Sequence, residues 1–142
     1  MSYEQALELA GSGLKPIEIA ACLGIEVLFL PFKTIKGLAL ALGSHKLILI
    51  DRDLTEIERQ LVCGHELGHF LFHTEANFMF ILEKTLFYPK QEYQANLFAC
   101  QLLLGEKAGV YETEIKEAAG YRSLREMESI ISCLVREDDG EL

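Results

Sequence analysis

Three absences narrow the classes of protein that this sequence can encode. It has no apolar run long enough to cross a bilayer, since stretches such as Leu38 to Leu42 are far shorter than the roughly 20 residues of a membrane helix. The N-terminal residues Met1 to Glu4 have neither the basic start nor the apolar segment of a secretion signal. The sequence also lacks internal repeats and low-complexity linkers. We therefore expect a soluble, cytoplasmic protein that does not enter the membrane.

The chain is also poor in basic residues. Thirteen Lys and Arg stand against 22 Asp and Glu, which gives a formal net charge of −9. A surface that binds DNA needs clustered Lys and Arg to replace the counterions of the phosphates. We therefore expect no direct binding of nucleic acid, and any link to DNA would run through a protein partner.

The cysteines lack the spacing of a disulfide scaffold or of a Cys-x-x-Cys site. Cys22, Cys63, Cys100 and Cys133 are widely separated, and three of them fall in apolar helical patterns. This pattern predicts small buried side chains in a reducing cytosol. Cys63 lies two residues before His65, but a helix turns it about 160° away, so we do not expect it to bind the same metal.

The length and composition are those of one globular domain. With 142 residues, of which 50% are hydrophobic and 25% charged, the chain can bury a proper core but cannot form two domains. We expect a single folded domain over residues 1–136. The acidic stretch at residues 137–142 is predicted to be a disordered tail.

The pattern of apolar residues predicts an α+β fold, with three strands between two groups of helices. Gly43-Ser44 is expected to form the turn between the second and third strands. Thr55 and Glu58 match a capping box, so the next helix should begin near Glu56. The predicted helices cover residues 3–10, 16–23, 56–73, 91–104, 113–119 and 124–135, and the predicted strands cover residues 25–31, 36–42 and 45–51.

The most specific chemistry lies in the stretch His65-Glu66-Leu67-Gly68-His69. Helical positions four apart are offset by only about 40° and rise about 6 Å, so His65 and His69 share one face. That is the arrangement of two ligands on one Zn²⁺. Glu66 follows the first ligand and lies beside the metal, where its carboxylate can take a proton from a metal-bound water.

A catalytic zinc site needs a third protein ligand and leaves the fourth position to water. Glu92 is the best candidate, because it opens a second helical stretch with Asn96 one turn later. The two side chains therefore share a face. Asn96 can then accept a hydrogen bond from the far ring nitrogen of a ligating histidine, which is the usual support for such a ligand.

These motifs resemble the core of the ImmA/IrrE family of zinc metallopeptidases, the M78 group with a gluzincin-type arrangement. The similarity rests on residues 65–73 and 92–99, and it extends from about Ile25 to Leu104. It implies a small zincin-like domain, with a three-stranded sheet packed on the two ligand-bearing helices. It also implies a cytosolic bacterial, phage or mobile-element protein whose relatives cleave, or trigger cleavage of, helix-turn-helix repressors.

Carried over by position, the resemblance makes His65, His69 and Glu92 the metal ligands and Glu66 the general base. One departure is Gln94, where the family usually has a second glutamate, and this side chain is not the expected ligand. In zincin-like enzymes an edge strand beside the cleft aligns the substrate peptide through backbone hydrogen bonds. The sequence does not say which strand is the edge.

Several residues near the motif remain open. His73 continues the histidine stripe, but on a straight helix it lies about 12 Å from His65, so we interpret it as a structural or rim residue. The apolar segment from Thr74 to Pro89 is either a short core segment or the lining of a substrate groove. Tyr88 and Tyr93 are both candidates to donate a hydrogen bond to an oxyanion.

Two hypotheses for function follow. The first is a zinc-dependent endopeptidase acting on a repressor or another regulatory protein. The second is a metal-containing binding module that sequesters a regulator without cutting it, for which an acidic surface would suit a basic DNA-binding partner. The intact Glu66 favours the enzyme, and a purely structural zinc site would need a fourth protein ligand. Zn²⁺ is the default ion, with Mn²⁺ and Fe²⁺ also compatible with these ligand types.

Overall fold

The computed structural model describes residues 2–33, 35–72, 89–120 and 124–139, with the side chains of all of these except residues 72, 89–92 and 136–139. The order of the α-helices and strands is the one that the sequence predicts, and a 3₁₀ helix at Gly105–Gly109 was not predicted. The chain begins with α1 (Tyr3–Gly11) and α2 (Pro16–Cys22), followed by the strands β1 (Glu26–Leu30), β2 (Gly37–Leu42) and β3 (His45–Asp51). It continues with α3 (Glu56–Phe72), α4 (Pro89–Leu104), the 3₁₀ helix η2 (Gly105–Gly109), α5 (Glu112–Ala119) and α6 (Leu124–Asp139).

The three strands form a mixed sheet in the order β1-β3-β2. β3 runs parallel to β1 and antiparallel to β2. The hairpin between β2 and β3 turns at Gly43, whose φ of 64° lies in the left-handed region that favours glycine. Within the part of the chain that the structure describes, β1 and β2 are therefore the two edges of the sheet.

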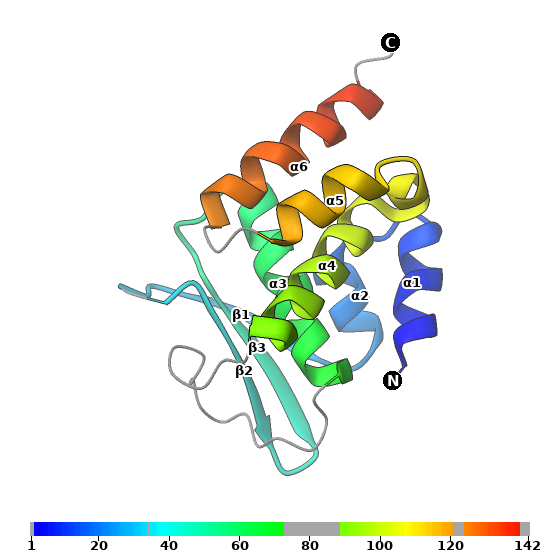
Figure 1. Ribbon diagram of the computed structural model, residues 1–142. Coiled ribbons are helices and arrows are strands. Elements are labelled where there is room, and N and C mark those ends of the chain that lie inside the picture. Colours follow the sequence, from blue (N-terminus) through cyan, green and yellow to red (C-terminus); the bar gives the residue numbers. More distant parts are fainter. Residues whose placement is uncertain (1, 34, 73–88, 121–123, 140–142) are drawn as a thin grey trace.

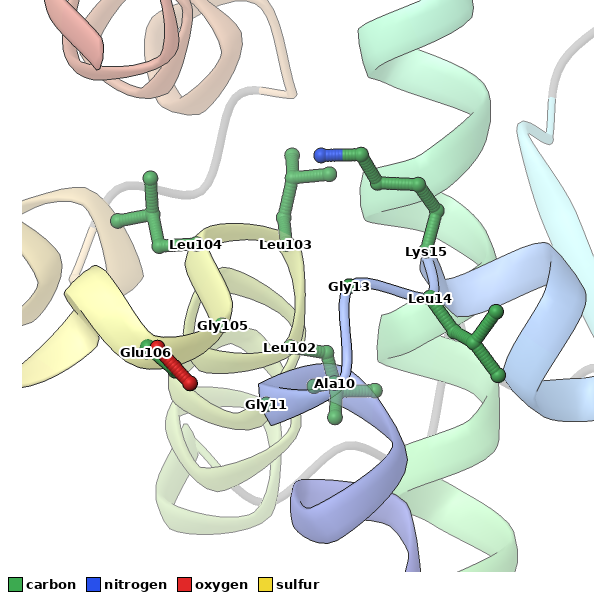
Figure 2. Close-up of a pocket in the computed structure, with 10 residues that line it drawn as sticks. All are labelled: Ala10, Gly11, Gly13, Leu14, Lys15, Leu102, Leu103, Leu104, Gly105 and Glu106. Atoms are coloured by element: carbon green, nitrogen blue, oxygen red, sulfur yellow. The ribbon is translucent and has the colours of Figure 1, made fainter.

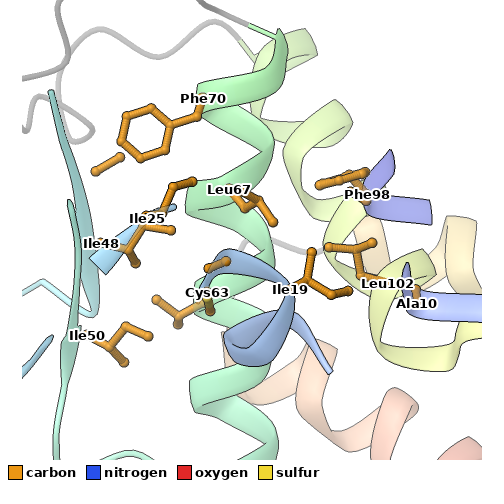
Figure 3. Close-up of a cluster of buried hydrophobic side chains, with 14 residues drawn as sticks. Ala10, Ile19, Ile25, Ile48, Ile50, Cys63, Leu67, Phe70, Phe98 and Leu102 are labelled. Atoms are coloured by element: carbon orange, nitrogen blue, oxygen red, sulfur yellow. The ribbon is translucent and has the colours of Figure 1, made fainter. Parts of the chain in front are cut away.

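One face of this sheet packs on α3, and α3 packs in turn on α4 (Figure 1). Figure 3 shows the same order from closer by, with Ile48 and Ile50 of β3 directed toward α3. Beyond α3, Ile19 of α2 lies beside Leu102 of α4. All four side chains are almost inaccessible to solvent. The helix that carries the motif is thus held between the sheet and a layer of helices.

A second cluster of buried side chains supports α3 near its start. Leu61 of α3 belongs to this cluster, together with Leu103 of α4, Ile115 of α5 and Ile131 of α6. The two C-terminal helices therefore contribute to the same framework and do not form a separate unit.

The capping box predicted for α3 is present. The backbone N–H of Glu58 donates to Oγ1 of Thr55 at 3.2 Å, and the N–H of Thr55 donates to Oε1 of Glu58 at 3.0 Å. These two bonds satisfy donors that a helix start would otherwise leave without partners. The helix consequently begins at Glu56, as expected.

The end of the last helix needs a correction. α6 runs to Asp139, four residues beyond the predicted end at Val135, so residues 137–139 of the expected disordered tail are helical. The sequence has no glycine or proline between Val135 and Gly140 that would end the helix earlier. Residues 140–142 lie outside the described part of the chain.

The cysteines are free thiols in two different environments. Cys63 and Cys100 are buried, as the apolar patterns predicted, whereas Cys22 and Cys133 are exposed. An apolar helical pattern therefore identified the buried thiols on the two central helices but not the outward positions on α2 and α6. No helix among the described residues is long and apolar enough to cross a bilayer.

Candidate functional site

The two motif histidines lie one turn apart on α3, and their rings meet. Nε2 of His69 is 3.1 Å from Nε2 of His65. The rings are nearly perpendicular, at 82°, with their centroids 4.7 Å apart. Two nitrogens that bind one tetrahedral Zn²⁺ at about 2.0–2.1 Å would be roughly 3.3 Å apart. The observed spacing therefore fits two nitrogens that face a common ion.

Asn96 of α4 forms a hydrogen bond with the other ring nitrogen of His65. Nδ1 of His65 is 2.7 Å from Oδ1 of Asn96, so the ring donates its Nδ1–H to the amide oxygen. This bond leaves the lone pair on Nε2, the nitrogen that faces His69. The amide nitrogen of Asn96 donates in turn to the carbonyl oxygen of Ala119, at 3.2 Å. The orientation of His65 is thus tied to α4 and, through α4, to the end of α5.

The sequence indicated one of these two contacts but not the other. Asn96 was expected to support a histidine because it lies one helical turn after the candidate ligand Glu92 and shares a face with it. The partner on α5 is a backbone carbonyl of an alanine, and every residue in the chain has such a group. Ala119 therefore left no signal that could have been found without the tertiary structure.

Glu66 is buried beside the edge strand β2. Its side chain is only 5% exposed. A Cβ added at Gly37, the first residue of β2, would be 3.5 Å from Oε2 of Glu66 and would overlap the side chain of Val62. The missing side chain at Gly37 thus allows the edge strand to lie directly against the helical turn that carries Glu66.

The charge of this carboxylate also affects a neighbouring thiol. Burial raises the pKa of Cys63 far above its ordinary value, and the negative charge of Glu66 raises it further. Cys63 is therefore a neutral thiol inside the core at physiological pH.

Four small residues bring α3 and α4 close together at the site. A Cβ added at Gly64 would be 2.8 Å from Cα of Ala99, and one added at Gly68 would be 3.2 Å from Cα of Ala95. Glycines four apart on one helix thus face alanines four apart on the other. This pattern is visible in the sequence and would have predicted the close contact, but the sequence reasoning did not use it.

Other predicted site residues lie wholly or partly outside the described part of the chain. Glu92 falls near the start of α4, but its side chain is not among those described. His73, Tyr88 and the rest of residues 74–88 also lie outside, whereas Tyr93 is on α4 and 37% exposed. Among the described side chains, no three His, Cys, Asp or Glu residues come together as a metal site. The third ligand therefore stays a prediction.

A small cavity elsewhere in the molecule is not part of this site. Figure 2 shows it between the α1–α2 connection and the end of α4, where Lys15 and Glu106 flank apolar and glycine residues. Its volume is about 180 Å³. Cavities that bind small molecules are usually about 300–1,000 Å³. We therefore interpret it as a packing gap beside Gly105, whose backbone lies against the carbonyl of Ala10.

Comparisons with known proteins identify a family and a relative of this chain. The chain matches the model of the peptidase M78 family, the IrrE N-terminal-like domain, over residues 20–111. The uncharacterized immunity region protein 2 of Bacillus phage phi105 is 41% identical over 93 residues, which are 63% of this chain and 58% of the phage protein. The alignment thus spans less than two thirds of that relative. No solved structure matches the chain.

The family match confirms the resemblance that the motifs suggested. It runs from α2 to the residue before α5, so it includes the whole sheet and both helices of the candidate site. Because the model covers well over half of the sequence, the chain belongs to the peptidase M78 family of IrrE N-terminal-like domains.

Proposed function

We propose that the protein is a zinc-dependent endopeptidase. The observation that carries this proposal is the convergence of the two Nε2 atoms of His65 and His69, 3.1 Å apart, with His65 oriented by Asn96. Paired imidazoles on one helical turn, one of them fixed through its far nitrogen, are typical of a catalytic zinc site. Membership of a peptidase family supports the same chemistry.

In this proposal His65, His69 and Glu92 hold the ion, and Glu66 is the catalytic base. Zinc, when bound, polarises the attacking water and the scissile carbonyl. The Glu66 carboxylate takes a proton from the water and passes it to the leaving amine. Its burial keeps bulk water away and strengthens the electrostatic interactions at the site.

The edge strand β2 is the proposed place for the substrate backbone. Among the described residues, β2 pairs with β3 on one side only, and its first residue lies against the turn of Glu66. An extended peptide that adds to this edge would run past the catalytic base with its backbone fixed by hydrogen bonds. The glycine at position 37 keeps that approach unobstructed by a side chain.

The proposed substrate is a regulatory protein, with a helix-turn-helix repressor as the leading class. The family resemblance implies this class, and the similarity to an immunity region protein of a phage is consistent with it. The chain's net charge of −9 would attract the basic DNA-binding surface of such a repressor. Since such regulators act on DNA, the expected place of action is the cytoplasm.

Replacement of Glu66 by glutamine tests the mechanism. We expect Glu66→Gln to retain bound zinc and to lose about 10²–10⁴-fold in cleavage rate, because the amide cannot accept the proton of the water. The measurement is a proteome-wide survey of new N-termini in cells that express the wild type or the variant. Glu114→Gln, the same change at an exposed position on α5, is the control and should cleave normally.

A second candidate function is sequestration of the regulator without cleavage, which the strongly acidic composition favours. The same variant separates the two functions. If Glu66→Gln relieves repression as well as the wild type does and no new N-termini depend on Glu66, the protein acts by binding and the peptidase mechanism is wrong.

A further inference from the structure

The face of the sheet that points away from α3 is made of leucines. Along β3 the buried Ile48 and Ile50 face α3, so Leu47 and Leu49 face the other way, because side chains alternate along a strand. The strand register places Leu28 of β1 and Leu38 of β2 on either side of Leu49. The same register places Leu40 of β2 beside Leu47. Five leucines therefore form the centre of this outer face.

Two further leucines extend the outer face at opposite corners. Leu30 lies at the end of β1, and Leu42 lies at the far end of β2. Leu30 is 39% exposed and Leu42 is 54% exposed, and Leu28 between them is 39% exposed. Among the described helices, α2 and α3 make the main contacts with the strands, and they lie on the opposite side (Figures 1 and 3). No described helix covers the leucines.

These seven leucines of β1, β2 and β3 form what we call the leucine face, and its dimensions match those of one helix. From the level of Leu30 to that of Leu42 the strands advance six residues, or about 20 Å, and the three strands span about 10 Å. The diagonal between these corners is therefore about 22 Å. A helix of about 15 residues has this length, and its diameter of 10–12 Å matches the width. A stable homodimer usually buries about 800 Å² per subunit, which is more than this face can supply.

The charge around the leucine face differs from that of the rest of the molecule. The segment that forms the sheet and the turn after it, residues 26–53, carries Lys33, Lys36, Lys46 and Arg52 against Glu26, Asp51 and Asp53, whereas the whole chain has a net charge of −9. Three of these basic residues, Lys33, Lys36 and Arg52, are exposed.

The basic residues adjoin one end of the leucine face. The carbonyl of Lys36 accepts a hydrogen bond from the N–H of Asp51, and the N–H of Arg52 donates to the carbonyl of Leu30. The opposite end carries Glu26, which is 3.5 Å from Nε2 of His45. Asp51, which pairs with Leu30, is buried at the same end as Lys36, and Arg52 falls in the register of Ile48 and Ile50, which face α3. A helix along the diagonal would therefore meet the exposed Lys33 and Lys36 at the Leu30 end of the face.

We propose that the leucine face docks an amphipathic helix of a partner protein, with acidic side chains on the part of the helix that meets Lys33 and Lys36. The apolar stripe of the helix covers the leucines, as helices cover the sheets of layered folds. The basic rim selects acidic partners and speeds their association. An anionic membrane is disfavoured, because the chain as a whole would be repelled by it. This docking does not depend on the zinc site or on cleavage.

The test uses the full chain with isotope-labelled leucine methyl groups and two synthetic 15-residue helical peptides. Both peptides carry the same leucine stripe, and one has glutamates and the other lysines beside it. We expect the glutamate peptide to shift the methyl signals of the outer leucines, including Leu38 and Leu49, and to bind about three- to tenfold tighter than the lysine peptide. Lys36→Glu should remove this preference. Lys116→Glu, the same change on α5, should keep it.

The exposed leucines provide variants that leave the inner core intact. Leu28→Thr and Leu30→Thr, both on β1 and therefore away from the proposed substrate strand β2, keep a strand-forming residue and should weaken binding of the peptide while Glu66-dependent cleavage is unchanged. Four results would overturn the proposal: no shift of the leucine signals, equal binding of both peptides, leucine methyls inaccessible to a soluble paramagnetic agent, or a dimer abolished by Leu28→Thr. The proposal would also be contradicted if the protein bound phosphatidylglycerol vesicles through the leucines and did not bind the glutamate peptide. That result would assign the leucine face to a membrane.

Discussion

The two faces of the sheet both carry apolar side chains but have different surroundings. The inner face carries Ile48, Ile50 and Ala39, all buried against α3 and its neighbours. The outer face carries the leucines, none of which belongs to the main core cluster. An apolar composition therefore does not by itself show which side of a strand packs into the core. The inner face holds the helix of the candidate site, and the outer face is left for a partner.

The size of the side chains explains which face of β2 packs against α3. On β2 the inner positions are Gly37, Ala39 and Ala41, and leucines alternate with them on the outer side. Small inner residues allow α3 to approach the strand so closely that a side chain at Gly37 would overlap Val62. If the leucines faced inward, they would separate the sheet from the helix that carries Glu66.

The largest expected effect comes from two neighbouring residues on β3. Ile48→Ala should lower the free energy of unfolding by about 2–5 kcal/mol, because it leaves a cavity between the sheet and α3. Leu49→Ala, one residue further on the outer face, should cost about 1 kcal/mol or less, because its side chain is only partly buried. Urea denaturation of both variants measures the difference. Equal losses would mean that the outer face is packed as tightly as the inner one.

The fold was largely predictable from sequence, whereas the assignment of faces was not. Turn and cap residues such as Gly43, Thr55 and Gly105 determine the ends of their elements through local backbone geometry, so the strands and α3 begin and end close to the predicted residues. Which side of β2 turns inward depends on the distance to α3, which lies about 20 residues later in the chain. Such a contact cannot be inferred from the alternation of leucine and alanine alone.

A smaller effect is expected where α3 meets α4. Gly64→Ala should destabilise the protein by about 1–3 kcal/mol, since the new Cβ would be 2.8 Å from Cα of Ala99 and must push the helices apart. The loss should exceed the gain of about 1 kcal/mol in helix propensity. Thermal unfolding measures it. Gly109→Ala, where a Cβ meets nothing within 4 Å, is the matched control.

Gly64→Ala also tests whether the packing of α3 against α4 positions the histidines of the candidate site. The helices that Gly64 and Ala99 bring together carry His65 and Asn96, whose hydrogen bond is 2.7 Å long. We expect Gly64→Ala to weaken zinc binding along with stability. If stability falls as predicted while zinc affinity is unchanged, the contact between the helices does not position the histidine.

The site, like the fold, was only partly predictable. The spacing of His65 and His69 and the shared face of Glu92 and Asn96 follow from helical periodicity, which is a local property. The contact of Glu66 with the start of β2 and the anchoring of Asn96 by α5 depend on how distant elements pack. Local patterns therefore identified the chemistry, and only the tertiary structure indicates where a substrate strand would lie.

A further effect concerns pH and is absent at neutral pH. Burial raises the pKa of the Cys100 thiol from 9.0 to about 12, so above pH 9 the unfolded chain loses a proton that the folded chain keeps. The stability present below pH 9 is therefore lost as the pH rises toward 12, by up to about 1.4 kcal/mol per pH unit for each such thiol. Cys100→Ala should reduce this slope by about that amount, as measured by denaturation at pH 9, 10 and 11.

The exposed thiol on α6 provides the control for this prediction. Cys133→Ala removes a cysteine that is open to solvent and should leave the slope of stability against pH as it is in the wild type. If both variants change the slope equally, burial of Cys100 between α4 and its neighbours is not the cause.

The zinc content of the purified chain tests the central claim most directly, namely that α3 and α4 together form a catalytic metal site. We predict about one zinc per chain for the wild type and for Glu114→Ala, which changes an exposed glutamate on α5. Glu92→Ala should lose most of the metal, and Asn96→Ala should bind it about 10–100-fold more weakly. A wild-type chain that binds no zinc, or a Glu92→Ala variant that binds it as tightly, would contradict the account.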